Sequence, residues 1–235
     1  MLRPSKFHKN KMPHNWLIYK IGDKFINQHQ NLYQGILVDL GCGEASYKQY
    51  FLQTASQYIG VDWSETQHHS HADVVSDLNK KVELESDTAD TVVSFAVLEH
   101  LSEPQVFLNE AHRILKNGGH IILQVPWQWH EHEAPHDYFR YSQYGLRHLL
   151  TKAGFSEINI SAQAGIFTTL CVKTNYFFVR AIHKLPKYLM YPLALLCLPI
   201  WTINQCLAPL FDHLDRNWSN ETIGHFITAK KSNSG

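Results

Sequence analysis

Between residues 35 and 161 of this chain, short apolar runs alternate with stretches of helical periodicity. Such alternation is typical of βαβ units built around a parallel sheet. A further run at 222–229 alternates apolar and polar positions, as a half-buried strand does. The pattern predicts an α/β core with strands at 36–40, 58–61, 72–76, 91–95, 120–125, 155–161 and 222–229.

Helical periodicity is clearest between residues 103 and 115, and Asn117-Gly118-Gly119 is predicted to stop that helix. A second helix is predicted at 143–153, ended by Gly154. A helix is also expected directly after the glycines at 41 and 43. Before the core, apolar positions recur at helical spacing between residues 17 and 26. Residues 1–34 are therefore expected to form a helical arm that packs on the core or covers its ligand.

The segment 188–211 contains no charged residue and is long enough in principle to cross a bilayer. Its three prolines, Pro192, Pro199 and Pro209, argue against a simple span. Residues 162–221 are expected to form an apolar helical insertion between the core at 35–161 and the final strand and tail at 222–235. Four interpretations stay open for 176–211: a packed insertion, a homodimer contact, a helix lying at a membrane surface beside the preceding basic residues and, disfavoured by the prolines, a true membrane span.

Composition narrows the class of partner. The 21 Lys and Arg residues balance the 21 Asp and Glu residues, so no basic surface for nucleic acid is expected. The four cysteines include no CxxC pair, which argues against disulfides and against a thiolate zinc site. No signal-peptide pattern follows the basic start. We therefore expect a cytoplasmic protein, with peripheral contact at the inner face of the membrane as an open alternative.

A glycine turn, Gly41-Cys42-Gly43, follows the first predicted strand. Glycines there let the backbone turn sharply and approach a ligand. Asp62 ends the second strand, where a carboxylate can accept hydrogen bonds from ribose hydroxyls. Asp77, after the third, could accept one from an adenine amino group. These strand ends predict an adenosine-containing ligand.

The charge of Asp39 indicates which adenosine compound fits. This carboxylate precedes the glycine turn and would repel the pyrophosphate of a dinucleotide. It would attract the ammonium and sulfonium of S-adenosylmethionine instead. Ser46 also stands where the third glycine of the dinucleotide motif would be.

The segments VDLGCG, YIGVD, DTVVSFAVLEHL and HRILKNGGHIILQVP together resemble class I S-adenosylmethionine-dependent methyltransferases. LEHL is similar to the type 11 group and to quinone-biosynthesis O-methyltransferases. The resemblance implies a Rossmann-like, doubly wound seven-stranded sheet of order 3-2-1-4-5-7-6 with the last strand antiparallel. It also implies S-adenosylmethionine as cofactor, S-adenosylhomocysteine as product, and these cofactor-binding residues: Asp39, Gly41, Cys42, Gly43, Asp62, Trp63, Asp77, Leu78, Ala96 and Val97.

The loop after the fifth strand carries the candidate bases His132, Glu133, His136 and Asp137, with His100 as second choice. It is similar to a methyltransferase subgroup from cell-surface polysaccharide gene settings. Tyr138, Arg140 and Tyr141 are candidates for orienting the acceptor or closing the loop. The alternative is structural, since Arg140 could pair with Asp137 or Glu133 and only staple the loop.

The loop after the fifth strand and the run at 68–71 are rich in histidine, a residue that commonly binds metal ions. Some quinone O-methyltransferases are thought to hold an ion where Glu99 and His100 stand, but no spacing here matches a dedicated site, so no metal is expected. The sequence predicts methyl transfer to oxygen of a small molecule, a glycan or a lipid-linked compound. The alternatives are a non-catalytic, membrane-associated protein that binds S-adenosylmethionine and, behind it, an NAD-dependent oxidoreductase.

Overall fold

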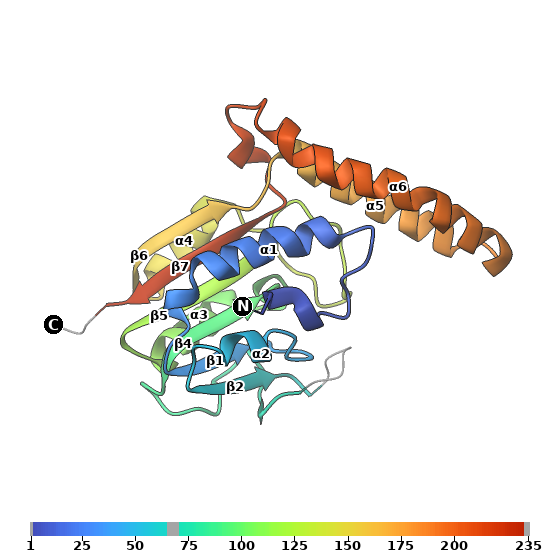
Figure 1. Cartoon of the computed structure of the whole chain (residues 1–235). Helices are drawn as coiled ribbons and strands as arrows, with labels where there is room; N and C mark the ends of the chain where they lie inside the picture. The colour runs from blue at the N-terminus through green and yellow to red at the C-terminus, as the bar shows by residue number, and fades with distance from the viewer. Residues whose placement is uncertain (1, 65–70, 233–235) are drawn as a thin grey trace.

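A computed structural model describes residues 2–64 and 71–232 of the 235-residue chain. A twisted sheet lies at the centre, helices cover both of its faces, and a pair of long helices projects from one side (Figure 1). His68 and His69 of the histidine-rich run at 68–71 lie outside the described residues.

The described residues form one sheet of seven strands in the order β3-β2-β1-β4-β5-β7-β6. Strand β7 pairs antiparallel with β5 and β6, while the remaining pairs are parallel. The order and the antiparallel last strand confirm the predicted architecture. The strands are β1 (Ile36–Leu40), β2 (Gln57–Asp62), β3 (Val74–Val75), β4 (Ala89–Phe95), β5 (Leu115–Pro126), β6 (Phe155–Ala162) and β7 (Gly224–Lys231).

Helices occupy most of the connections between the strands. The α-helices are α1 (Trp16–Gln28), α2 (Lys48–Phe51), α3 (Pro104–Ile114), α4 (Gln143–Lys152), α5 (Ile166–His183) and α6 (Lys187–Asp212). The short 3-10 helices are η1 (Pro4–Phe7), η2 (Gln30–Leu32), η3 (Leu98–His100) and η4 (Trp218–Glu221).

The core is divided between the two faces of the sheet, because successive side chains of a strand point in opposite directions. On β1, Val38 belongs to the cluster that contains the α3 and α4 side chains, while Leu37 belongs to the cluster with α1 and α2. Strand β4 divides in the same way between Val92 and Val93. Burial on both faces explains why these strands read as continuous apolar runs.

Helix α3 ends at Ile114, and the prediction that Asn117-Gly118-Gly119 stops it is wrong. These residues lie inside β5, which begins earlier than predicted. The pairing of β5 with β4 shifts register between Ala89 and Thr91. A Cβ on Gly119 would stand 2.9 Å from the carbonyl oxygen of Asp90, so this glycine permits a close backbone approach between the strands.

Two other elements are shorter than predicted. Strand β3 covers only Val74 and Val75, because it lies at the edge of the sheet and pairs with β2 alone. The helix expected after the glycine turn begins only at Lys48 and ends at Phe51. Ala45 has a φ of 50°, which a helix does not allow, so the backbone has to complete the turn first.

The predicted insertion is a hairpin of two antiparallel helices, α5 and α6, which lie side by side in Figure 1. Its base is fixed to the rest of the molecule by buried polar contacts. The Asp212 carboxylate accepts hydrogen bonds from the N–H groups of Gly165 and Thr168, each at 3.0 Å, at the start of α5. The side chain of Gln205 joins α6 to the N-terminal arm, where it binds the backbone of Leu17 at 3.0 Å and of Pro13 at 2.8 Å.

Candidate active site

A cavity of about 580 Å³ opens at the carboxyl ends of β1, β2 and β4. Open α/β sheets bind ligands at this edge. All ten predicted cofactor-binding residues line it, as do His100, His132, Glu133, His136 and Tyr138. Asp137, Arg140 and Tyr141 are not among its lining residues.

The glycine turn and Asp62 form one hydrogen-bonded unit at the floor of this cavity. The N–H of Gly43 donates to Oδ2 of Asp62 at 2.7 Å, and the N–H of Trp63 donates to Oδ1 at 2.7 Å. Gly43 has a φ of 52°, and a Cβ there would meet no atom within 4 Å. The turn therefore leaves open space above its backbone and holds the Asp62 carboxylate in one orientation.

Gly41 serves a different purpose. Its φ is 85°, and a Cβ at this position would stand 2.4 Å from Cγ2 of Val97. The glycine thus lets the end of β1 pass against the segment after β4, where Ala96 and Val97 line the cavity.

Asp39 is a buried acid at the end of β1. Burial raises its pKa to about 7, although the hydroxyl of Tyr58 donates a hydrogen bond at 2.7 Å that favours the charged form. The negative charge of Asp62 adds to the rise. A cationic ligand group beside Asp39 would stabilise the charged carboxylate and so lower its pKa again.

Asp77 lies at the rim and is held differently. The N–H and the side-chain amide of Asn79 donate to its Oδ1 at 3.0 and 3.2 Å, and Lys80 pairs with Oδ2 at 3.1 Å. Burial raises the pKa of Asp77, but these contacts outweigh burial and leave the pKa below its usual value. Asp77 is therefore an acceptor in a fixed position.

The loop after β5 is stapled by Arg140. Its guanidinium binds both carboxylate oxygens of Asp137, at 2.6 and 2.7 Å, and also donates to the backbone oxygens of Trp129 and His130. The N–H of His132 donates to Asp137 as well, at 2.8 Å. The Arg140 hydrogen bonds hold the pKa of Asp137 far below its usual range, so this carboxylate accepts a proton poorly. The Arg140–Asp137 ion pair is the contact expected if these two residues hold the loop in place and take no part in the reaction.

His100 presents a basic nitrogen to the cavity. Its Nδ1 lies 2.6 Å from the carbonyl oxygen of His136, and since a carbonyl only accepts, Nδ1 carries the hydrogen. Nε2 is then the nitrogen with the lone pair. It lies 3.7 Å from Glu99 and 3.9 Å from Glu133. Burial lowers the pKa of His100, so the imidazole is neutral near pH 7.

Glu99 precedes His100 in η3 and is fully buried. Neither of its carboxylate oxygens has a hydrogen-bond partner among the described residues. Burial raises its pKa to about 8, so it holds a proton at neutral pH. Its backbone oxygen accepts from the N–H groups of Tyr138 and Phe139, which anchors the stapled loop on η3.

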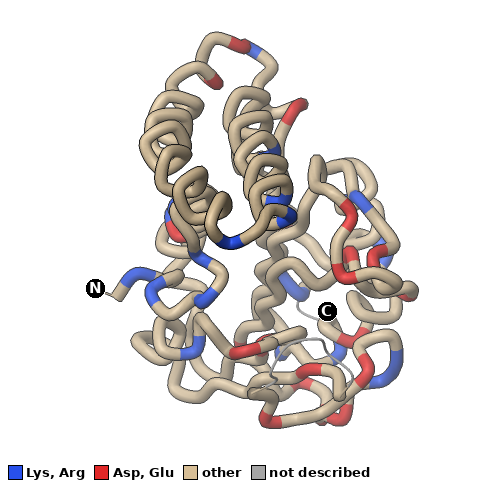
Figure 2. The backbone as a smooth tube through the Cα atoms, turned by 90° about the vertical axis from the view of Figure 1, so that its right-hand side faces the viewer, with Lys and Arg blue, Asp and Glu red and all other residues tan. Residues whose placement is uncertain are grey.

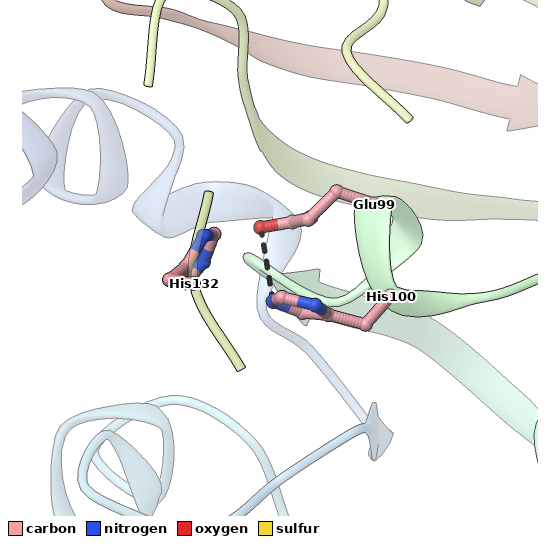
Figure 3. A group of neighbouring side chains, drawn as sticks. All are labelled: Glu99, His100 and His132. Carbon is pink, nitrogen blue, oxygen red and sulfur yellow. Dashed lines mark ion pairs between the residues drawn. The ribbon is translucent and has the colours of Figure 1, made fainter. Parts of the chain in front are cut away.

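Glu99, His100 and His132 come together from two elements, η3 and the loop after β5 (Figure 3). The rings of His100 and His132 have centroids 4.7 Å apart. One ligand atom from each of the three residues lies within 4.8 Å of the others, so the group could hold a divalent ion. The same closeness serves proton transfer.

Replacement of Glu99 by glutamine should stabilise the protein at alkaline pH. The folded-state pKa of about 8 exceeds the usual 4.5, so stability is complete at low pH and is lost as pH rises toward 8. Glutamine is neutral at every pH, so the variant should not lose this stability. We expect its free energy of unfolding to exceed that of the wild type by about 2–4 kcal/mol near pH 8. Urea denaturation of both proteins at pH 5 and pH 8 measures the difference.

Glu110→Gln is the control for this prediction. Glu110 pairs with Arg113 at 2.7 Å, and its pKa is lowered, so this substitution should destabilise the protein at neutral pH. Identical pH dependence in the wild type and Glu99→Gln would contradict the assignment of a buried neutral acid.

Several cavity residues were not identified from the sequence. Tyr176 of α5 and Trp129 of the stapled loop form one wall, with ring centroids 5.0 Å apart. His8 and Tyr19 of the N-terminal arm also line the cavity. The arm was expected to cover a ligand or pack on the core, but only the fold shows which of its side chains reach the cavity. Of these residues, only Gln124 could have been found from the sequence, because it lies at the end of a predicted strand. In the fold it lies beside Ala96.

Residues 38–123 match the family model described as a methyltransferase domain. This part of the chain is therefore similar to methyltransferase domains, and the sheet order is the one that the sequence resemblance implies. A Mycobacterium tuberculosis protein named "Probable S-adenosylmethionine-dependent methyltransferase" is 27% identical over 120 residues, 45% of this chain and 44% of that protein. A Mycolicibacterium smegmatis protein with a similar name is 28% identical over 116 residues, 43% of this chain and 45% of that protein. The aligned part spans less than half the length of either relative.

Solved structures agree with the fold. A SAM-dependent methyltransferase from Archaeoglobus fulgidus has a TM-score of 0.55 at 15% identity and covers 90% of this chain and 94% of its own. The [4+2]-cyclase SpnF has a TM-score of 0.58 at 17% identity, covering 88% and 82%. Similarity at this level shows a common fold, and the cyclase shows that this fold also serves other reactions.

Proposed function

We propose that this protein transfers the methyl group of S-adenosylmethionine to an oxygen atom of an acceptor that is a small molecule, a glycan or a lipid-linked compound. The observation that carries the proposal is a single cavity lined by Asp39, Asp62 and Asp77 and by His100. The three acids suit an adenosine-bearing cation, and the imidazole suits an acceptor that has to lose a proton.

The described residues fit this cofactor. Asp62 has a fixed carboxylate for ribose hydroxyls, and the open space above Gly43 admits a ligand against the backbone. Asp39 supplies a negative charge at the end of β1, where a cation would stabilise its ionised form. A dinucleotide would instead place its pyrophosphate beside this acid.

When bound, S-adenosylmethionine supplies a methyl group on a positively charged sulfur, which makes the methyl carbon electrophilic. The chain has to orient the acceptor oxygen and remove its proton. Nε2 of His100 can take that proton, because the carbonyl of His136 fixes the hydrogen on Nδ1. The Glu133 carboxylate, 3.9 Å from Nε2, stabilises the resulting imidazolium.

The walls of the cavity also favour an acceptor with apolar surface. Trp129, Tyr138 and Tyr176 present aromatic rings, and His136 packs edge-on against Trp63 with centroids 5.2 Å apart. Hydroxyl groups are poor nucleophiles until they lose a proton, so a positioned base points to oxygen as the receiving atom.

The acceptor class can be tested with S-adenosylmethionine labelled in its methyl group. The purified protein is incubated with a total cell extract, which is then partitioned between organic solvent and water. The proposal predicts transferred label whose product contains an O-methyl group by mass spectrometry. Label in the organic phase assigns a lipid-linked acceptor, and label in water assigns a glycan or small molecule. An N-methyl or C-methyl product would overturn the assignment to oxygen.

Treatment with a chelator should leave turnover unchanged, because the proposed reaction uses His100 as a base and requires no ion. The measurement is the rate of methyl transfer before and after dialysis against EDTA, with and without added Zn²⁺. Loss of activity that Zn²⁺ restores would show instead that Glu99, His100 and His132 act as ligands.

A further inference from the structure

Helix α6 exposes an apolar surface where a helix in water would carry polar residues. Its buried side chains, Trp201, Gln205, Ala208 and Asp212, recur at the spacing of a packed seam. Positions outside this seam are also apolar, and Leu195 and Leu196 are 68% and 67% exposed. A helix that is apolar all round normally lies in a protein core or in lipid.

Most of this surface lacks any cover within the chain. Among the described residues, α6 is the helix long and apolar enough to cross a bilayer by length and composition, yet only 17% of its most apolar stretch is buried. Exposed apolar side chains continue onto α5 at Leu170, Phe177 and Phe178. A contiguous surface of this kind marks a contact with a membrane or another protein.

The charges of the hairpin decide between these partners. Residues 158–211 contain four basic side chains, Lys173, Arg180, Lys184 and Lys187, and no Asp or Glu. All four are exposed, and none pairs with a described acid. Over the whole chain the charges balance, so this concentration of one sign is local. In Figure 2 the two helices are mostly tan with a few blue positions, and red appears at the end of α6, whose last residue is Asp212.

Basic groups beside apolar and aromatic side chains are complementary to an anionic lipid surface. The headgroups would meet the Lys and Arg side chains, and Tyr188 and Tyr191, 75% and 64% exposed, suit the boundary between headgroups and acyl chains. A second copy of the same hairpin would instead bring like charges together.

The contacts at the base of the hairpin favour a helix lying at the membrane surface. Only the part between Lys187 and Trp201 is free of the core, and it measures about 21 Å at 1.5 Å per residue. A bilayer core is about 30 Å thick. Crossing it would break the contacts of Gln205 with the N-terminal arm.

We propose that the α5–α6 hairpin binds the surface of a bilayer that contains anionic phospholipids, with the apolar side chains of α6 among the acyl chains. This binding does not depend on methyl transfer. Tyr176 of α5 lines the cavity, so the docked hairpin would place the cavity beside the lipid surface. If the proposed methyl transfer is correct, the acceptor would then enter the cavity from the bilayer, and this last step rests on the proposed function.

The test is flotation of the full chain with vesicles of phosphatidylcholine, with and without phosphatidylglycerol. We expect binding that requires the anionic lipid. Because each basic residue strengthens such binding about fivefold, Lys184→Glu with Lys187→Glu should weaken it at least tenfold. Leu195→Asp with Leu196→Asp should abolish it. The controls are Lys152→Glu and Tyr144→Ser, two exposed positions on α4 that should change nothing.

Circular dichroism establishes that each variant is folded, and sedimentation without vesicles gives the oligomeric state. A dimer that fails to float, and that Leu195→Asp with Leu196→Asp converts to a monomer, would overturn the proposal in favour of a second copy. Equal binding to both vesicle types would overturn the role of the basic residues. Neither flotation nor sedimentation depends on methyl transfer. A failure of the proposed function can therefore be told apart from a failure of membrane binding.

Discussion

Asp62→Ala should weaken the binding of S-adenosylmethionine about 100-fold or more. The carboxylate lies at the end of β2, lines the cavity and is fixed by the N–H groups of Gly43 and Trp63, each at 2.7 Å. Two hydrogen bonds from ribose hydroxyls to a charged acceptor account for a loss of that size. Alanine also releases the glycine turn from its partner. Isothermal titration of wild type and variant measures the effect.

The matched control is Asp73→Ala. Asp73 also accepts a hydrogen bond from a backbone N–H, that of Gly60 at 2.8 Å, but it does not line the cavity. Its replacement should leave the dissociation constant unchanged. Equal affinities for wild type and Asp62→Ala would contradict the assigned cofactor position.

His100→Gln should lower kcat by at least about 100-fold and leave cofactor affinity intact. In the wild type, kcat/KM should fall as pH drops through the pKa of His100, because the imidazolium has no lone pair. Burial lowers that pKa, so the fall should lie below pH 6.5, the usual value for histidine. Glutamine does not titrate, and the variant should lose this acidic limb. Initial rates between pH 5 and pH 8 test both parts.

His112→Gln is the control for this variant. Burial also lowers the pKa of His112, but the residue lies on α3 against Phe155 and away from the cavity. If kcat/KM of His100→Gln still falls at low pH, another group acts as the base. His132 and Glu133 are then the next residues to replace, since both line the cavity.

The framework of the fold could be predicted because it depends on local patterns. The strands of the parallel core are apolar on both faces, and the positions of β1 and β4 were clear from the sequence alone. The strand order came from the resemblance of the motifs. The start of β5 could not be predicted, because a glycine pair such as Gly118-Gly119 commonly ends a helix, whereas here Gly119 admits close contact with β4.

The sequence could predict that the ten residues assigned to the cofactor lie close together, since each of them lies at or near the end of a strand. All ten predicted positions, among them Asp62 and Asp77, line one cavity. The acceptor side depends on contacts between distant segments. His100 gains its orientation from the carbonyl of His136, and Tyr176 reaches the wall from a helix late in the chain. Periodicity and spacing carry no information on such pairs.

The burial of Glu99 shows the same limit. In the sequence Glu99 looks like an ordinary acid beside His100. Only the folded structure shows that both of its carboxylate oxygens are buried without a hydrogen-bond partner among the described residues. Its neighbours come from η3 and from the stapled loop, which meet only in the folded chain.

The most direct measurement of the central claim is the formation of S-adenosylhomocysteine in a defined incubation. Purified protein, methyl-labelled S-adenosylmethionine and cell extract are combined, and product and incorporated label are counted over time against Asp62→Ala. We expect the wild type to form one S-adenosylhomocysteine for each methyl group incorporated, and the variant to form almost none at the same cofactor concentration. Tight binding of S-adenosylmethionine that is then recovered intact, with no label in any fraction, would contradict it.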